Sequence, residues 1–292
     1  MTAPGISLND LTTAMQSLWP THNAADWDKV GLVLGAGDMQ ISRVLFVVDV
    51  TPATVAEAIE MNCQAIVAHH PLLLRSVHDL AESTAKGAHV AELIRAGIAL
   101  YSAHTNADVA QDGVAAVFAE KIGLLGCEPI EPSLGDSSLG IGRVGDLASP
   151  VTLGDMANRV ASVLPETVTG VRVAGESSQP VTRVAVCPGA GDSVLNNERV
   201  ISADVYITAD LRHHPVRDAI DEAAASGRTF AVIEVSHWAG ESLWLESAAH
   251  ALATKLPGLN CLVSSINTDP WLFSAGSNPS LNQQPNSGAK QL

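Results

Sequence analysis

Positive charge is scarce in this sequence. Lys and Arg number 16 against 31 Asp and Glu in 292 residues, which gives a formal net charge of −15. Because such a surface repels both the nucleic-acid backbone and anionic lipid, we expect neither nucleic acid nor a membrane as a partner. An anionic small substrate fits only where bound cations reverse the field locally.

Long apolar runs and closely spaced cysteines are also missing. No run of about 20 apolar residues occurs, so the sequence predicts no membrane-spanning helix. Residues 1–5 lack the basic and apolar segments of a secretory signal. The cysteines lie far apart, at Cys63, Cys127, Cys187 and Cys261, which is typical of reduced thiols and not of a disulfide framework or a zinc knuckle. We therefore expect a cytoplasmic protein.

What the sequence does have is enough apolar residues for a large core. They make up 47% of the chain and charged residues only 16%, which indicates one large or two ordinary globular domains. Apolar runs alternate with helical patterns in the first part of the chain, which favours a parallel sheet with both faces covered. The predicted strands there lie at 43–50, 64–70 and 98–103, and the predicted helices at 52–61, 84–96 and 113–122.

A stretch rich in Pro, Ser and Gly at residues 128–140 indicates a domain boundary. We predict an α/β fold of two interleaved α/β domains with largely parallel strands. The first domain is expected at 1–127 and the second at 128–228, with 229–273 returning to complete the first domain and 274–292 forming a mobile tail. In the second block, strands are expected near 139–147, 169–174, 181–187 and 204–208, and a helix near 193–201.

Side chains that can hold a metal ion follow three predicted strands directly. The first segment is His69–His70, the second is His104–Asp108 and the third is Ser236–Glu241. Ligand sites in open α/β sheets form at the carboxyl ends of strands, so the three segments have a common place to converge. His237 and Glu241 lie four residues apart in a predicted helix, which puts them on one face.

The chemistry of these side chains indicates the kind of ion. Imidazole and carboxylate together suit Zn, Mn, Fe or Co better than Ca or Mg. The segments offer more ligands than the three that one catalytic ion needs from a protein. The surplus predicts two divalent ions about 3.5–4 Å apart.

Other residues expected near the same edge of the sheet have two possible roles each. His213 and His214 are either substrate contacts or polar caps, and Asp49 either lies behind the ligands or caps the next helix. Residues 189–193 form either an anion-binding nest at a helix N-terminus or a plain turn, of which the turn is the better fit. Asp210 lies in a loop near the expected cleft and has no assigned role.

Several motifs occur in an order that resembles one protein family, the NIF3-like family, also called GTP cyclohydrolase 1 type 2 proteins. The resemblance covers nearly the whole chain. Its motifs are Trp27-Asp28 with Val30-Gly31-Leu32, Asp49-Val50-Thr51, His69-His70-Pro71, His104-Thr105-Asn106 with Asp108, Gly140 to Gly145, Asp204 with Thr208 and Asp210, and Ser236-His237 with Glu241.

The resemblance implies a dinuclear metal centre in the cleft between the two domains and a homohexameric assembly. His104 would lie at the metals, and His104 and Glu241 are the candidate catalytic residues. The metal ligands implied by the motif match are His69, His70, Asp108, His237 and Glu241.

The function implied by the resemblance is metal-dependent hydrolysis of a nucleotide-like substrate. A metal-activated water would open the guanine ring of GTP, and the ions would offset the negative charge of the chain. A non-catalytic, metal-binding hexameric scaffold or regulatory protein would have the same sequence features, and a plain phosphoesterase would differ only in its substrate.

Overall fold

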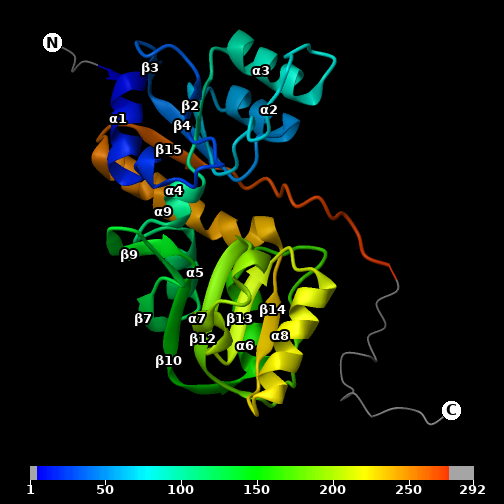
Figure 1. Cartoon of the computed structure of the whole chain (residues 1–292). Helices are drawn as coiled ribbons and strands as arrows, with labels where there is room; N and C mark the ends of the chain where they lie inside the picture. The colour runs from blue at the N-terminus through cyan, green and yellow to red at the C-terminus, as the bar shows by residue number, and fades with distance from the viewer. Residues whose placement is uncertain (1–4, 276–292) are drawn as a thin grey trace.

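The computed structural model describes residues 5–275, which contain two large β-sheets, each covered by helices on both faces, and two small two-stranded sheets (Figure 1). The predicted α/β class is confirmed. All but the first two residues of the expected tail lie outside the described residues. No helix in the described part of the chain is long and apolar enough to cross a membrane.

The first sheet has five strands, of which four are parallel. Its order is β15-β4-β5-β6-β2, and only the edge strand β2 is antiparallel to its neighbour. The three central strands are almost wholly apolar and buried, as expected for a sheet covered on both faces, and the edge strands β2 and β15 are partly exposed. The five strands are β2 (Gly31–Leu34), β4 (Arg43–Val47), β5 (Ala65–Ala68), β6 (Ala99–Ser102) and β15 (Asn260–Val263).

Two pairs of helices cover this sheet. On one face, α2 (Pro52–Glu60) and α3 (Ala85–Ala96) pack on it. On the other face, α1 (Leu8–Leu18) and α9 (His237–Lys255) pack on it. The ends of α2 and α3 follow local chemistry, because Thr51 caps α2 before Pro52, and Gly97 ends α3 in the left-handed conformation. A short pair, β1 (Ile6–Ser7) with β3 (Gln40–Ile41), and the turn η1 (Thr21–Asn23) complete this part.

The second sheet has six strands of mixed direction, in the order β11-β14-β13-β12-β10-β7. The pairs β12–β13 and β13–β14 are parallel, and the other three pairs are antiparallel. Its strands are β7 (Leu124–Glu128), β10 (Arg143–Thr152), β11 (Arg172–Ala174), β12 (Pro180–Ala190), β13 (Val205–Ala209) and β14 (Ala231–Glu234).

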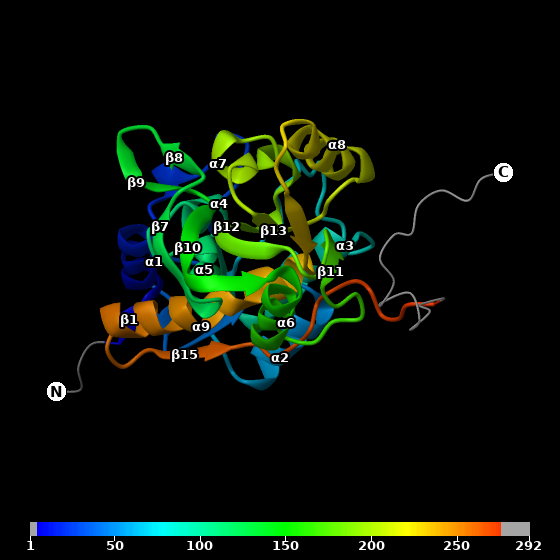
Figure 2. The same cartoon turned by 90° about the horizontal axis from the view of Figure 1, so that it is seen from below.

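Helices cover this second sheet on both faces as well (Figure 2). On one face lie α5 (Val114–Lys121) and α6 (Leu153–Val163), together with α9. On the other face lie α7 (Glu198–Ile201) and α8 (His213–Ala225). The helix expected near 193–201 is thus only the 3₁₀ turn η2 (Asp192–Val194) followed by the single turn of α7.

Strand pairing differs from the expected domain bounds at two places. β14 pairs with β13 in the second sheet, whereas we expected residues 229–273 to complete the first domain; only α9 and β15 do so. A strand that follows a crossover helix normally lies beside the strand before that helix, which is the relation of β14 to β13 across α8. β7 also joins the second sheet, by antiparallel pairing with β10.

The helix α9 joins the two sheets. It runs through the junction between them (Figure 1), and its residues pack into the cores of both. Its apolar residues are spread around the helix, as is typical of a helix buried on most sides. At its first turns, α9 packs directly on β12, where a Cβ on Gly240 would lie in van der Waals contact with Pro188, at 3.4 Å. The fold therefore fixes the N-terminus of α9 between the two sheets.

A buried arginine holds the loop that follows the second metal-binding segment. The side chain of Arg143 is 3% exposed and donates hydrogen bonds to the carbonyl oxygens of Gly140, Gly142 and Ala110, at 2.8, 2.7 and 2.5 Å. Gly140 ends the hairpin of β8 (Glu131–Ser133) and β9 (Asp136–Ile141), and Ala110 follows α4 (Thr105–Asp108). Arg143 thus fastens the loop after α4 to the second sheet.

We predict that Arg143→Leu lowers the free energy of unfolding by about 3 kcal/mol, because three buried carbonyls lose a donor. The control is Arg183→Leu, which removes an exposed ion pair with Asp146 and should cost less than about 1 kcal/mol. Urea unfolding of both variants checks this, and equal midpoints would contradict the role given to Arg143.

Candidate metal centre

The three predicted segments converge at the carboxyl ends of the strands. His69 and His70 follow β5, and His104 and α4 follow β6, its parallel neighbour. Ser236 caps α9 by accepting a hydrogen bond from the amide of Ala239 and so starts the helix that carries the third segment. The convergence expected from the order of strands is therefore present in the structure.

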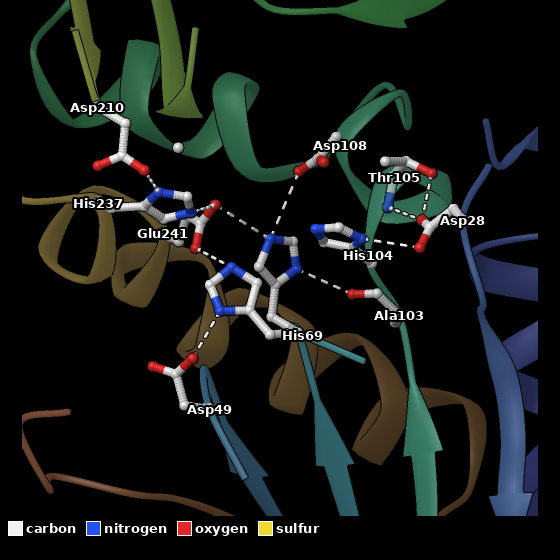
Figure 3. Close-up of polar contacts among 12 residues, drawn as sticks. Asp28, Asp49, His69, Ala103, His104, Thr105, Asp108, Asp210, His237 and Glu241 are labelled. Atoms are coloured by element: carbon white, nitrogen blue, oxygen red, sulfur yellow. Dashed lines mark hydrogen bonds and ion pairs between the residues drawn. The ribbon is translucent and has the colours of Figure 1, made fainter. Parts of the chain in front are cut away.

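Glu241 lies at the centre of this cluster (Figure 3). Its Oε1 lies 2.9 Å from Nε2 of His237 and 3.5 Å from Nε2 of His69. Its Oε2 lies 2.8 Å from Nε2 of His70. Asp108 approaches from the opposite side, with Oδ1 3.7 Å from Nε2 of His69. The structure thus brings all five predicted metal ligands together.

Two overlapping groups have ligand atoms close enough for one ion each. The first is His69, His70 and His104, and the second is His70, His237 and Glu241; within each group the atoms lie within 4.8 Å of one another. Asp108 belongs to neither group and contacts the cluster through His69. His104, which we expected beside the metals, is as well placed as the predicted ligands.

Each imidazole is held from behind by a hydrogen bond from its Nδ1. His70 donates to Asp49 and His237 donates to Asp210, both at 2.7 Å. This leaves Nε2 of both rings directed toward Glu241. Such outer partners fix the tautomer and orientation of metal-binding histidines. Asp49 therefore lies behind the candidate ligand His70, which is one of the two positions expected for it. Asp210, to which the sequence assigned no role, lies in the same way behind His237.

The other two rings follow the same pattern. His69 donates from Nδ1 to the carbonyl of Ala103 at 2.9 Å, and His104 donates to Asp28 at 3.0 Å. Asp28 also accepts hydrogen bonds from the amide and hydroxyl of Thr105. Sequence reasoning placed Asp28 only in a family motif, because its contact with His104 spans 76 residues.

Two buried polar atoms of the cluster lack a hydrogen-bond partner among residues 5–275. They are Nε2 of His69, in a fully buried side chain, and Oε2 of Glu241, in a residue that is 4% exposed. Buried polar atoms are normally satisfied, and an unsatisfied one is costly. Oε1 of Glu241 lies 3.5 Å from Nε2 of His69, and Oε2 lies 2.8 Å from Nε2 of His70. Imidazole nitrogens gathered around a buried carboxylate are a ligand set that suits a divalent cation.

The charges of the cluster also favour a cation. Burial raises the pKa of Glu241, but the charges of His70, His69 and His237 outweigh it and hold that pKa well below its usual range. Burial lowers the pKa of His70 and His237, but the charge of Glu241 raises these values to about 11 and about 10. In the absence of a metal ion, protons on the imidazoles therefore supply the positive charge that Glu241 requires.

Gly189, at the end of β12, was missed as a site residue. A Cβ there would lie 2.4 Å from Oε1 of Glu241, and the residue has φ +81°, which favours glycine. The hydroxyl of Thr208 donates to the carbonyl of Cys187 at 2.7 Å and so helps to fix this strand end. Neither interpretation of residues 189–193, as an anion nest or as a plain turn, predicted that Gly189 makes room for Glu241. The 3₁₀ turn η2 is too short to provide a helix N-terminus for an anion.

The pair His213 and His214 does not join the cluster. Both residues lie in the first turn of α8, and their ring centroids are 5.3 Å apart. Neither belongs to a group that could hold a metal ion, among the residues that the structure describes. They do not line the pocket beside the cluster either.

Comparison with known proteins identifies the family. The family described as Duf34/NIF3 (NGG1p interacting factor 3) matches residues 6–270. The chain belongs to this family. The resemblance seen in its motifs is confirmed.

Relatives of this Duf34/NIF3 protein cover almost its whole length. A Streptomyces coelicolor protein named GTP cyclohydrolase 1 type 2 homolog is 41% identical over 278 residues, which cover 93% of this chain and 96% of that protein. A Mycobacterium leprae protein of the same name is 30% identical and covers 92% of this chain and 96% of its own length. That second alignment spans 375 positions, so the mycobacterial protein carries residues that this shorter chain lacks.

Solved structures show the same fold. A Bacillus cereus protein related to NIF3 aligns with a TM-score of 0.84 at 24% identity and covers 94% of this chain and 100% of its own. A Staphylococcus aureus hypothetical protein aligns with a TM-score of 0.82 at 27% identity and covers 93% and 100%.

We predict that Gly189→Ala weakens divalent metal binding by at least about tenfold, because the new methyl group displaces the carboxylate of Glu241. Gly227→Ala is the matched control, since Gly227 also has a positive φ, +70°, but no atom within 4 Å of its Cβ position. Both variants carry a backbone cost of about 1–2 kcal/mol. Titration of chelator-treated protein with Zn²⁺ or Mn²⁺ measures the difference, and equal affinities would contradict the contact.

We also predict that metal affinity rises with pH. His70 and His237 hold protons in metal-free protein up to their pKa values of about 11 and about 10, so an ion must displace these protons to bind. Calorimetry in buffers of different ionisation enthalpy should record the release of about two protons per site at pH 7. An affinity that does not change between pH 6 and pH 8 would contradict this competition.

Proposed function

We propose that the protein is a dinuclear-metal-dependent hydrolase that acts on a nucleotide, with GTP as the first candidate. The observation that carries this proposal is the cluster of imidazoles around one buried carboxylate, with each ring oriented from behind by a carboxylate or carbonyl. The names of the relatives support the choice of GTP.

The residues fit two divalent ions of the Zn, Fe, Mn or Co class. The two groups overlap at His70, so they lie side by side, and Glu241 has one oxygen near His70 and the other near His237. The proposed ligands are His69, His70, Asp108, His237 and Glu241. Ions bound there supply Lewis-acid chemistry, which activates water and polarises the group under attack.

His104 is the proposed proton carrier. Burial raises the pKa of Asp28, but hydrogen bonds from His104 and Thr105 outweigh it and hold that pKa below its usual range. Asp28 therefore stays ionised and keeps the Nδ1 proton of His104 in place. Nε2 of His104 is then free to accept or deliver a proton at the reacting group of the substrate.

Exposure of the cluster supports a hydrolase over a metal-binding scaffold. The side chains of His70 and His237 are 26% and 28% exposed, and both line a pocket, so a substrate has access to them. A purely structural site would be closed on all sides. The same proposal includes a homohexameric assembly, implied by the family resemblance, and a cytoplasmic location, consistent with four free cysteines.

The test combines metal analysis with turnover. Purified protein should contain about two divalent ions per chain. It should also consume GTP, and the loss of GTP is measured by chromatography. In His69→Ala and Glu241→Ala, turnover should fall at least about 100-fold, because a metal ligand is lost. His250→Ala, an exposed histidine far along α9, is the control.

Two outcomes would decide against hydrolysis of GTP at this site. Equal GTP turnover in wild type, His69→Ala and Glu241→Ala would show that the cluster does not carry the activity. If the protein hydrolysed a generic phosphate ester such as p-nitrophenyl phosphate but did not consume GTP, the activity would instead be that of a phosphoesterase.

A further inference from the structure

The cluster is accessible from one side, through a pocket of about 480 Å³. This volume is in the range of small-molecule sites. The pocket reaches the cluster at His70 and His237 and at Asp49 and Asp210 behind them, whereas His69 is fully buried. A ligand in this pocket would therefore meet His70 and His237, behind which Glu241 is buried.

One wall of the pocket is formed by residues 268–271, in the chain segment 264–273 that follows β15. Thr268 donates to Oδ2 of Asp49 at 2.5 Å, and Asn267 donates to the carbonyl of Glu166 at 3.3 Å, so the segment contacts residues from both parts of the fold. Asp269 accepts a hydrogen bond from the amide of Trp271 at 2.9 Å. The segment thus holds Trp271 at the pocket in a defined backbone conformation.

Trp271 presents an indole ring to the pocket. The residue is 64% exposed although it lines a concave surface, and it stacks on no other aromatic ring among residues 5–275. An exposed aromatic face in a pocket is the usual platform for a planar ring such as a nucleobase.

Two charged groups that line the pocket form no ion pair among the described residues. One is the carboxylate of Asp269, which accepts a hydrogen bond from the backbone amide of Trp271, and the other is the ammonium group of Lys86. The carboxylates of Asp49, Asp210 and Glu234 are engaged by His70, His237 and Arg172. Lys86, in the first turn of α3, also lines the pocket, and it forms no ion pair with any residue that the structure describes. In a chain with net charge −15, an unpaired lysine in a pocket provides a local site for an anion.

We propose that this pocket binds an aromatic ring that carries an anionic group, as in a nucleoside phosphate, with the ring stacked on Trp271 and the anion paired with Lys86. This inference rests on the proposed function for the identity of the reacting group. It adds to that function the residues that select the substrate and the side from which the substrate reaches His70 and His237.

Calorimetric titration of the full-length protein with three probes tests the inference. The probes are GTP, guanosine and inorganic triphosphate, and the metal content of each preparation is measured. Trp271→Ala should weaken binding of GTP and guanosine by about tenfold or more. Lys86→Ala should weaken GTP and triphosphate several-fold and leave guanosine unchanged.

Two controls match these variants. Phe273→Ala removes an exposed aromatic ring, 82% exposed, from the same segment outside the pocket, and Lys255→Ala removes an exposed lysine at the end of α9. Both should bind all three probes as wild type does. Binding by Trp271→Ala and Lys86→Ala that equals these controls, or no detectable binding of any probe by wild type, would overturn the inference.

The outcome is separable from that of the proposed hydrolase. Binding that depends on Trp271 and Lys86, without GTP turnover, supports the pocket and rejects the hydrolase. Turnover that needs Glu241 but is unchanged by Trp271→Ala and Lys86→Ala rejects the pocket and leaves the hydrolase in place.

Discussion

The buried carboxylate of Glu241 is the constraint on which the rest of the site depends. An ionised carboxylate in a protein interior is strongly unfavourable unless positive charge lies beside it. Here three imidazoles surround it, and each would turn away without the hydrogen bond that holds its other nitrogen. The ring of outer partners therefore does as much to define the centre as the ligands themselves.

Both sheets contribute to this ring. The histidines after β5 and β6 come from the first sheet, whereas Gly189 and Asp210 follow strands of the second. α9 crosses between the sheets and carries His237 and Glu241 at the end that meets both. A change in how the two sheets pack against α9 would therefore alter the distances within the cluster even if the structure of each sheet stayed the same.

Much of the first sheet and the ligand cluster could be predicted from the sequence, because the evidence is local. Apolar runs that end in His69–His70 and His104 identify strand tips, and strand tips of a parallel sheet share an edge. The rest depends on distant contacts. The pairing of β14 with β13, the approach of Gly189 to Glu241 and the bond from His104 to Asp28 each join residues far apart in the chain, and no local pattern distinguishes them from ordinary strands, turns and acids.

The hydrogen bond from Thr268 to Asp49 connects the last described part of the chain to one of the earliest strand tips. During synthesis, His69, His70 and His104 leave the ribosome well before His237, Glu241 and Thr268, and chains grow at only about 5–20 residues per second. A nascent chain therefore lacks His237 and Glu241 for several seconds after His69, His70, His104 and Asp108 have been made. The proposed metal centre can therefore be complete only in nearly full-length chains, and a product truncated before His237 lacks the buried carboxylate of Glu241.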